Sequence, residues 1–301
     1  MRRGLVLEGG AMRGLFSAGV TDVLMEEGIV FDGAIGVSAG AAFGCNYKSM
    51  QPGRVIRYNK RFARDPRYAG VRSLLKTGDL FGAYFDYHLL PQRLDVMDEE
   101  TYCRNPMEFW FVCTDVRTGR PVYHRSDSLD YEELEWMRAS ASMPLVSGIV
   151  KAGGYELLDG GISDSIPLKQ FRKLGYDRNV VILTQPEGYV KKPDSSLLPV
   201  MRLAYRKYPR LTDALAGRHV MYNRQLDYVR KEEEAGRAYV IRPREALKIR
   251  RVEHDPAEMQ RVYDLGREEG VRRLDEVKRF LGEENCRRAD LSGVLKEEHQ
   301  S

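Results

Sequence analysis

A serine lies at the centre of a turn-forming motif between residues 31 and 44, FDGAIGVSAGAAFG. Gly36, Ser38 and Gly40 form a G-x-S-x-G pattern that follows an apolar run and precedes a run of small residues. A nucleophilic serine needs a sharp strand-to-helix turn that projects its hydroxyl, and this turn accepts only very small residues two positions away. The turn also leaves the first amides of the next helix free to bind an oxyanion. The pattern therefore predicts that Ser38 is a nucleophile.

A second glycine cluster, GGAMRG at residues 9–14, follows the first apolar segment. In a parallel sheet it would lie at the same carboxyl edge as the serine turn. The dinucleotide-binding fingerprint requires glycine where Ala11 stands, and a P-loop requires lysine and then serine or threonine where the chain has Gly14 and leucine. An oxyanion hole built from the backbone amides near Gly10 and Ala11, with positive charge from Arg13, requires neither residue. We therefore predict an oxyanion loop here.

The base that takes the serine proton is predicted from a third motif. The segment GGYELLDGGISDSIPL, residues 153–168, places Asp159 at the end of an apolar run and before Gly160 and Gly161. Two glycines allow the chain to turn sharply and leave the carboxylate exposed at the end of the strand. A carboxylate in a partly dry pocket has a raised pKa and can accept a proton from serine directly. Asp-Gly-Gly is also a common tight turn.

Histidine is the alternative base. The chain has five histidines, and an order of Ser38, Asp159 and then His219 or His254 is compatible with a conventional hydrolase triad. Ser38 nevertheless stands too early for that fold, because only one strand and one helix precede its own strand. A third alternative is a binding protein without catalysis, whose glycine turns hold an anionic ligand.

Taken together, these three motifs in this order resemble the patatin-like phospholipase family, in particular its bacterial acyl hydrolases. The resemblance covers residues 4–185 and includes the segment ASASMP at 139–144. It implies a Ser-Asp dyad that works without histidine through an acyl-enzyme intermediate, with Ser38 as nucleophile and Asp159 as base. It also implies an oxyanion loop, made of Gly9, Gly10, Ala11 and Arg13.

The chain departs from the family pattern at two positions of the loop. Glu8 stands where the family often has aspartate, and Ala11 replaces the third glycine. Ala11 keeps a backbone N–H, so the donor is retained if the turn does not require a positive φ. These departures bear on the geometry of the loop and not on the dyad.

The apolar patterning predicts an α/β fold with a mainly parallel sheet flanked by helices, which in the resembled family is a three-layer sandwich. We expect a catalytic domain at residues 1–190 and a charged, mainly helical C-terminal extension at residues 191–301 that completes or covers it. The segment between residues 64 and 98 is expected to be a covering loop and helix packed on the core, and the alternative is a lid that faces the substrate. The predicted strands are 4–8, 29–37, 109–116, 155–159 and 179–185, and the predicted helices are 15–28, 39–50, 199–218 and 257–284.

Composition limits the partners and cofactors. The 301 residues carry a net charge of +4, which is weak for a nucleic-acid binder. The four cysteines form no CxxC pair, so we expect no zinc site and no disulfide framework; the predicted chemistry also needs no metal or other cofactor, calcium included. No apolar run approaches the roughly 20 residues that span a bilayer. We expect a cytoplasmic protein.

The expected substrate is a lipid acyl ester, as in phospholipase A or lysophospholipase reactions, and the aromatic-rich segment 74–90 would line an acyl channel. Arg202, Arg206 and Arg210 recur every four positions beside Lys207, a pattern that favours a solvated face on a packed helix. The alternative is a basic amphipathic helix that contacts anionic lipid at a membrane surface. The acyl chain length, the head group and the oligomeric state are not predicted.

Overall fold

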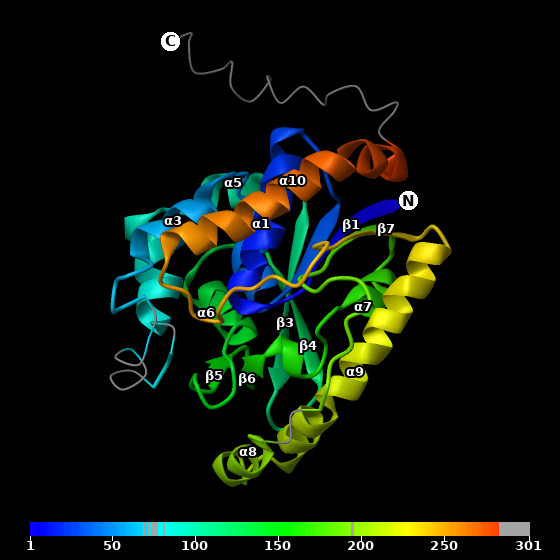
Figure 1. Cartoon of the computed structure of the whole chain (residues 1–301). Coiled ribbons are helices and arrows are strands. Elements are labelled where there is room, and N and C mark those ends of the chain that lie inside the picture. Colours follow the sequence, from blue (N-terminus) through cyan, green and yellow to red (C-terminus); the bar gives the residue numbers. More distant parts are fainter. Residues whose placement is uncertain (69, 71–72, 74–77, 81, 194–195, 283–301) are drawn as a thin grey trace.

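The computed structural model describes residues 1–68, 70, 73, 78–80, 82–193 and 196–282 (Figure 1). The chain end beyond these ranges, with Cys286 and His299, lies outside the described residues. The described part contains an eight-stranded sheet in the order β5-β6-β3-β2-β1-β7-β8, with β4 paired to β3. The strands are β1 (Arg2–Leu7), β2 (Gly33–Val37), β3 (Glu108–Asp115), β4 (Pro121–Ser126), β5 (Val150–Ala152), β6 (Tyr155–Asp159), β7 (Tyr176–Ile182) and β8 (Ala238–Ile241).

The centre of the sheet is parallel. Strands β3, β2, β1, β7 and β8 run in one direction, whereas β4, β5 and β6 are antiparallel to their neighbours. Every residue of β2 is buried, as expected for a parallel strand covered on both faces. The carboxyl ends of β1 and β2 therefore lie side by side, and the segments that follow them meet at one edge of the sheet.

Helices cover both faces of this sheet, because successive side chains of a strand point to opposite sides. Leu5 and Leu7 belong to one core, whereas Val6 between them belongs to another. The helical elements are η1 (Ala11–Arg13), α1 (Gly14–Glu26), α2 (Ala39–Lys48), α3 (Arg54–Phe62), the π-helix η2 (Phe85–Leu94), α5 (Glu99–Arg104), α6 (Tyr131–Ser140), η3 (Gly160–Ile162), α7 (Leu168–Lys173), α8 (Leu198–Ala204), α9 (Pro209–Glu234) and α10 (Pro256–Leu281).

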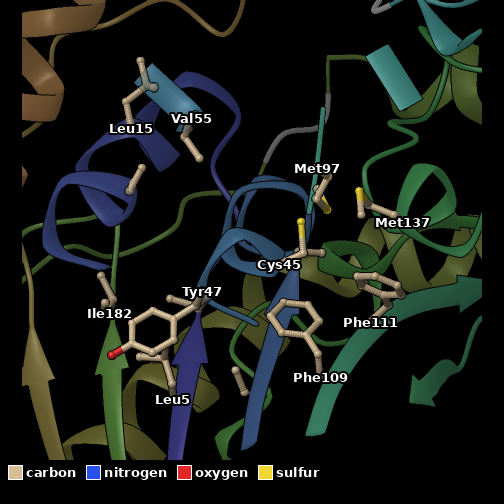
Figure 2. Packing of buried hydrophobic residues seen from close by; sticks show 14 of the residues in the cluster. Leu5, Leu15, Cys45, Tyr47, Val55, Met97, Phe109, Phe111, Met137 and Ile182 are labelled. Atoms are coloured by element: carbon tan, nitrogen blue, oxygen red, sulfur yellow. The ribbon is translucent and has the colours of Figure 1, made fainter. Parts of the chain in front are cut away.

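The larger core joins the sheet to α1, α2, α3, α6 and α10. Figure 2 shows Leu5, Phe109 and Phe111 of the strands packed beneath Cys45 of α2 and Met137 of α6. The smaller core lies on the other face, under α7 and α9. Figure 1 shows the yellow helix α9 across the sheet from α1 and the orange α10. The predicted parallel sheet between two helical layers is confirmed.

The C-terminal third of the chain contributes both to the sheet and to the larger core. Strand β8 extends the sheet beside β7, and α10 packs against α1. The two helices approach closely at Gly19 and Gly266, where a Cβ on Gly19 would lie 2.1 Å from the Tyr263 carbonyl oxygen. Only glycine fits such a backbone contact, so this pair of glycines fixes where the helices cross.

Several elements differ from the predictions. The single helix predicted over residues 199–218 is two helices, α8 and α9, because Pro209 lacks a backbone N–H and begins α9 instead of continuing α8. The predicted stripe is therefore divided, with Arg202 on α8 and Arg210 on α9. Strands β4, β5 and β8 were not predicted. Within the described ranges, no helix combines the length and the apolar character that crossing a bilayer demands.

Candidate active site

Ser38 occupies the turn between β2 and α2 with a φ of 56° and a ψ of −123°, a conformation that is strained for a residue with a side chain. Its backbone N–H donates to the Ser140 hydroxyl at 3.0 Å, and that hydroxyl donates to the Val112 carbonyl at 2.7 Å. A Cβ on Gly36 would lie 2.3 Å from the Gly40 carbonyl oxygen. The turn therefore requires small residues on both sides of the serine.

The Ser38 hydroxyl lies beside the Asp159 carboxylate and lowers the pKa of that carboxyl as a hydrogen-bonding neighbour. Asp159 ends β6 and is 6% exposed. The Gly161 N–H donates to its Oδ1 at 2.7 Å, and the Thr114 hydroxyl donates to its carbonyl oxygen at 2.8 Å. A Cβ on Gly160 would lie 2.1 Å from the Val112 carbonyl oxygen, so the glycine after the aspartate lets the turn fit against β3. The two predicted catalytic side chains are thus neighbours in the fold.

Burial raises the pKa of Asp159 above the ordinary value of an aspartate. The hydrogen bond from Ser38, the positive charge of Arg218 and the Gly161 N–H each lower it, but burial outweighs them. A carboxylate with a raised pKa accepts a proton more readily than an ordinary one. This arrangement suits a general base that acts on a neighbouring hydroxyl.

The glycine cluster lies against the serine turn, as predicted. A Cβ on Gly9 would lie 2.8 Å from the Ser38 Cβ, and one on Gly14 would lie 2.9 Å from the Ala39 Cβ. Neither Gly10 nor Ser38, the N-caps of η1 and α2, supplies a side-chain cap. Two helical N-termini whose first amides lack side-chain caps therefore meet at the serine, which is the arrangement that an oxyanion hole needs.

Ala11 adopts a φ of +48°. The sequence predicted that the Ala11 backbone N–H is retained as an oxyanion donor if the turn does not require a positive φ. The turn does have a positive φ at this residue, so that condition is not met. A left-handed conformation costs a residue with a Cβ about 1–2 kcal/mol. The loop accordingly has the path that a third glycine would favour, and an alanine follows it under strain.

Glu8, at the position where the resembled family often has aspartate, connects β1 to β7 and α9. Its carboxylate accepts hydrogen bonds from the Thr184 N–H and the Tyr222 hydroxyl, both at 2.6 Å. Burial raises the pKa of Glu8, while these donors and the charge of Arg13 lower it in part. The longer side chain is thus fully engaged in holding the oxyanion loop to the sheet.

An apolar pocket opens beside Ser38 on the α2 side of the turn. Tyr87 and Leu90 of η2 line it and lie within the segment that was expected to line an acyl channel. Asp86 also lines it, and its buried Oδ1 has no hydrogen-bond partner among the described residues. Other lining residues are Met12, Ala42, Phe43, Met97, Met137 and Met143.

The two alternative histidines make other contacts. The His219 Nδ1–H donates to the Ala216 carbonyl at 3.2 Å, and the His254 Nδ1–H donates to the Ala63 carbonyl at 2.6 Å. Within the described ranges, no hydrogen bond joins either ring to the Ser38 or Asp159 side chain. No group of three or more histidine, cysteine, aspartate or glutamate side chains in that part of the chain is arranged to hold a metal ion.

Arg218 of α9 is a site residue that the sequence analysis did not single out. Its Nε donates to the Gly161 carbonyl at 2.5 Å, directly behind the turn that carries Asp159. Tyr222 and Gln225 lie on the same face of α9, one and two turns further on, and contact Glu8 and Asp164. This spacing of polar residues is the signal that could have marked the face, although no motif distinguishes it.

The sequence matches known proteins over these same regions. Residues 5–172 match the family model described as patatin-like phospholipase, and residues 208–282 match DUF6363, a domain of unknown function. The uncharacterized protein YjjU of Escherichia coli is 31% identical over 235 residues, which cover 67% of this chain and 60% of YjjU. Lysophospholipase nte1 of Aspergillus terreus is 30% identical over 181 residues, which cover 58% of this chain and 11% of nte1. Among solved structures, VipD of Legionella pneumophila is similar with a TM-score of 0.43 and 12% identity, covering 91% of this chain and 67% of VipD.

Proposed function

The chain belongs to the patatin-like phospholipase family, and from this premise we propose that it is a serine hydrolase of lipid acyl esters with a Ser38–Asp159 dyad. The observation that carries the proposal is the position of the Ser38 hydroxyl beside the buried Asp159 carboxylate, whose pKa it lowers. This arrangement supplies both a nucleophile and the base that activates it.

The reaction proceeds in two steps through an acyl-enzyme. Asp159 accepts the proton of the Ser38 hydroxyl while Oγ bonds to the ester carbonyl carbon, and the backbone amides of the glycine loop and of α2 stabilise the oxyanion. The tetrahedral intermediate collapses, and the alcohol leaves with the proton from Asp159. Asp159 then takes a proton from water, which attacks the acyl-enzyme, and the proton returns to Ser38 as the fatty acid leaves.

The apolar pocket beside Ser38 supports an acyl chain as the part of the substrate that is bound there. Methionine, phenylalanine and leucine side chains line it, and such surfaces favour hydrocarbon over water. The name of the relative nte1, a lysophospholipase, is consistent with such a substrate. We therefore propose phospholipase A-like or lysophospholipase-like activity.

The dyad is tested by labelling with a fluorophosphonate, peptide mapping and turnover of a p-nitrophenyl ester. Ser38→Ala is expected to lose both labelling and turnover, and Asp159→Asn to lose turnover by about 10³-fold or more. The exposed Asp127→Asn is the matched control and keeps full activity. Turnover that survives in Asp159→Asn and disappears on replacement of His219 or His254 would favour a triad esterase. No labelling at all would favour an anion-binding protein without catalysis.

The lipid part of the proposal has its own test, which is the release of fatty acid from phospholipid and monoacylglycerol dispersions. Release from either, lost in Ser38→Ala, is the expected result. Turnover of short soluble esters without any release from lipid would contradict the lipid assignment and leave the dyad intact.

We also propose that α8 contacts an anionic membrane surface. None of its residues is buried, and Val200 and Leu203 are 52% and 72% exposed. Arg202 lies between them, and Arg206 and Lys207 follow, so apolar and cationic groups occur together. Leu203→Asp should reduce flotation with phosphatidylglycerol-containing vesicles, whereas Val271→Asp, at a position 62% exposed on α10, should not. Unchanged flotation in Leu203→Asp would count against the contact.

A further inference from the structure

Three cationic side chains lie near one another beside the catalytic turns, and none of them lines the apolar pocket. Arg13 belongs to the oxyanion loop, Lys191 to the loop that follows β7, and Arg218 to α9. Burial and the positive charges of Arg218 and Arg13 act together on the Lys191 ammonium, so the three groups are close enough to repel one another. None of them forms an ion pair with a carboxylate in the described part of the chain.

Lys191 is held in this position by its backbone. Its N–H donates to the Asn223 Oδ1 at 2.8 Å, and the Asn223 Nδ2 donates to its carbonyl at 3.0 Å. Its ammonium lies 5.2 Å from the centre of the Tyr222 ring. Asn223 and Tyr222 are adjacent residues of α9, so this helix fixes the main chain of Lys191 and supports its side chain. The ammonium is thus placed by the fold.

The positive charges of the cluster are compensated only in part. Glu8 is the acidic group that interacts with Lys191, whereas Arg218, Arg13 and Arg251 repel it. Burial and these repulsions lower the pKa of Lys191 to about 8. The Nε of Arg13 is buried and has no hydrogen-bond partner in the described residues. A buried donor without a partner and a cation with a lowered pKa both indicate a site that an anion would complete.

We propose that Lys191, Arg218 and Arg13 bind the phosphate group carried by the alcohol portion of the substrate. Phosphate offers several acceptor oxygens and up to two negative charges, which match two guanidinium groups and an ammonium. The inference rests on the proposed hydrolysis, because it takes the ester bond to lie at Ser38 between an acyl chain in the pocket and a phosphate on the other side.

The inference also gives a role to the C-terminal third of the chain. Arg218, Tyr222 and Asn223 all lie within residues 208–282, the segment that matches a domain of unknown function. This segment supplies one phosphate ligand and positions a second. It would therefore determine which alcohol the enzyme releases, while residues 5–172 supply the chemistry.

The experiment compares two substrates with the same acyl chain, a 1-acyl lysophosphatidate and a 1-monoacylglycerol, both below their critical micelle concentrations. In Lys191→Met and in Arg218→Met, the ratio of kcat/KM for the phosphate substrate to that for the neutral one is expected to fall about tenfold or more, as for loss of a charged hydrogen bond. Arg218→Lys should recover part of the loss. Arg224→Met, an exposed arginine on the same helix, is the control and should leave the ratio unchanged.

A second measurement does not depend on catalysis. Calorimetric titration of the Ser38→Ala protein with inorganic phosphate and with glycerol 3-phosphate should show binding, weakened about tenfold or more by Lys191→Met. If the wild-type protein has no hydrolase activity but phosphate binds, the proposed hydrolysis is contradicted, whereas the phosphate-binding site is retained. If the ratio of kcat/KM values is unchanged in both Lys191→Met and Arg218→Met, the inference is overturned even when inorganic phosphate binds. The site would then bind free phosphate and not the phosphate group of the substrate. Absence of phosphate binding together with an unchanged ratio would overturn it as well.

Discussion

The two sides of Ser38 are built from opposite chemistry. On the side of α2, η2 and α6 the walls are mostly apolar, although Asp86 also lines them. The buried guanidinium of Arg54 donates a hydrogen bond to Asn46 and is neutralised by an ion pair with Asp95. On the side of α9 the polar groups lie at the catalytic turns, and the cations Lys191 and Arg218 form no ion pair with a carboxylate among the described residues. A single hydroxyl between such surfaces suits an ester whose two halves differ in polarity.

The difference follows from the two faces of the sheet. The apolar side belongs to the larger core, where a pocket surrounded by hydrocarbon side chains excludes water and binds hydrocarbon. The smaller core on the other face leaves the polar face of α9 in contact with the carboxyl edge of the sheet. Substitutions in the apolar pocket should therefore alter how kcat/KM depends on the length of the acyl chain. Substitutions among the cations on the α9 side should alter how kcat/KM depends on the charge of the substrate.

Among substitutions that distinguish the two sides and leave the dyad in place, the largest expected effect comes from filling the pocket with Ala42→Phe. Ala42 lines the pocket, and its N–H bonds to the Ser38 carbonyl at 3.0 Å, so a larger side chain enters the pocket close to the nucleophile. Excluding about four CH₂ groups, at about 0.8 kcal/mol each, removes about 3 kcal/mol of binding, or roughly 100-fold in kcat/KM for a long acyl chain. The measurement is kcat/KM for p-nitrophenyl dodecanoate against p-nitrophenyl butyrate.

The exposed Ala257→Phe on α10 is the control for this substitution and should leave both substrates unaffected. The preference for a phosphate-bearing substrate over a neutral one should also persist in Ala42→Phe, because the cations lie on the other side of the serine. A loss that is equal for dodecanoate and butyrate would mean that the pocket does not hold the acyl chain.

A smaller effect is expected in the pH profile of Arg218→Met. Asp159 acts as a base only when deprotonated, so kcat/KM for a neutral ester falls as the pH decreases through the pKa of Asp159, which burial has raised. The positive charge of Arg218 lowers that pKa, so its removal should move the acidic limb to higher pH. On the acidic limb the activity of Arg218→Met would then lie below that of the wild type, whereas at pH 8 it would be unchanged.

Arg218→Lys keeps the charge and should show a smaller shift, and the exposed Arg224→Met should show none. Profiles of kcat/KM for p-nitrophenyl butyrate between pH 4 and 8 distinguish the variants. If the acidic limb of Arg218→Met occurs at the same pH as in the wild type, the Arg218 guanidinium does not act on the Asp159 carboxylate. The two sides of the serine would then be independent in their electrostatics.

The parts of this molecule that were predicted from sequence are those with local signals. The turn at Ser38 follows an apolar strand within a few residues, and Asp159 ends a strand whose predicted limits, 155–159, are those observed. Family membership and the parallel sheet were predicted from the same motifs. The π-helix η2 was not, because it includes Pro91 and has no regular apolar period.

The cationic side was not predicted, because its residues are brought together only by the fold. Lys191 has no motif around it, and its position depends on contacts with Asn223 some 30 residues later. Arg218 was included in the basic segment that was expected to form one helix. The break at Pro209 separates α9 from α8 and lets the face of Arg218 pack against the catalytic turns.

The smallest expected effect is that of Ala11→Gly, in the loop where the two sides meet. Glycine relieves the strain of the positive φ, about 1–2 kcal/mol, and loses about 0.5–1 kcal/mol through the greater entropy of the unfolded chain. The free energy of unfolding, measured by urea denaturation, should therefore rise by about 0.5–1 kcal/mol. Since glycine keeps the backbone N–H, turnover should change less than about threefold. A stability gain accompanied by a large loss of turnover would mean that the strained alanine orients the oxyanion donor, and that the loop depends on its side chain as well as its backbone.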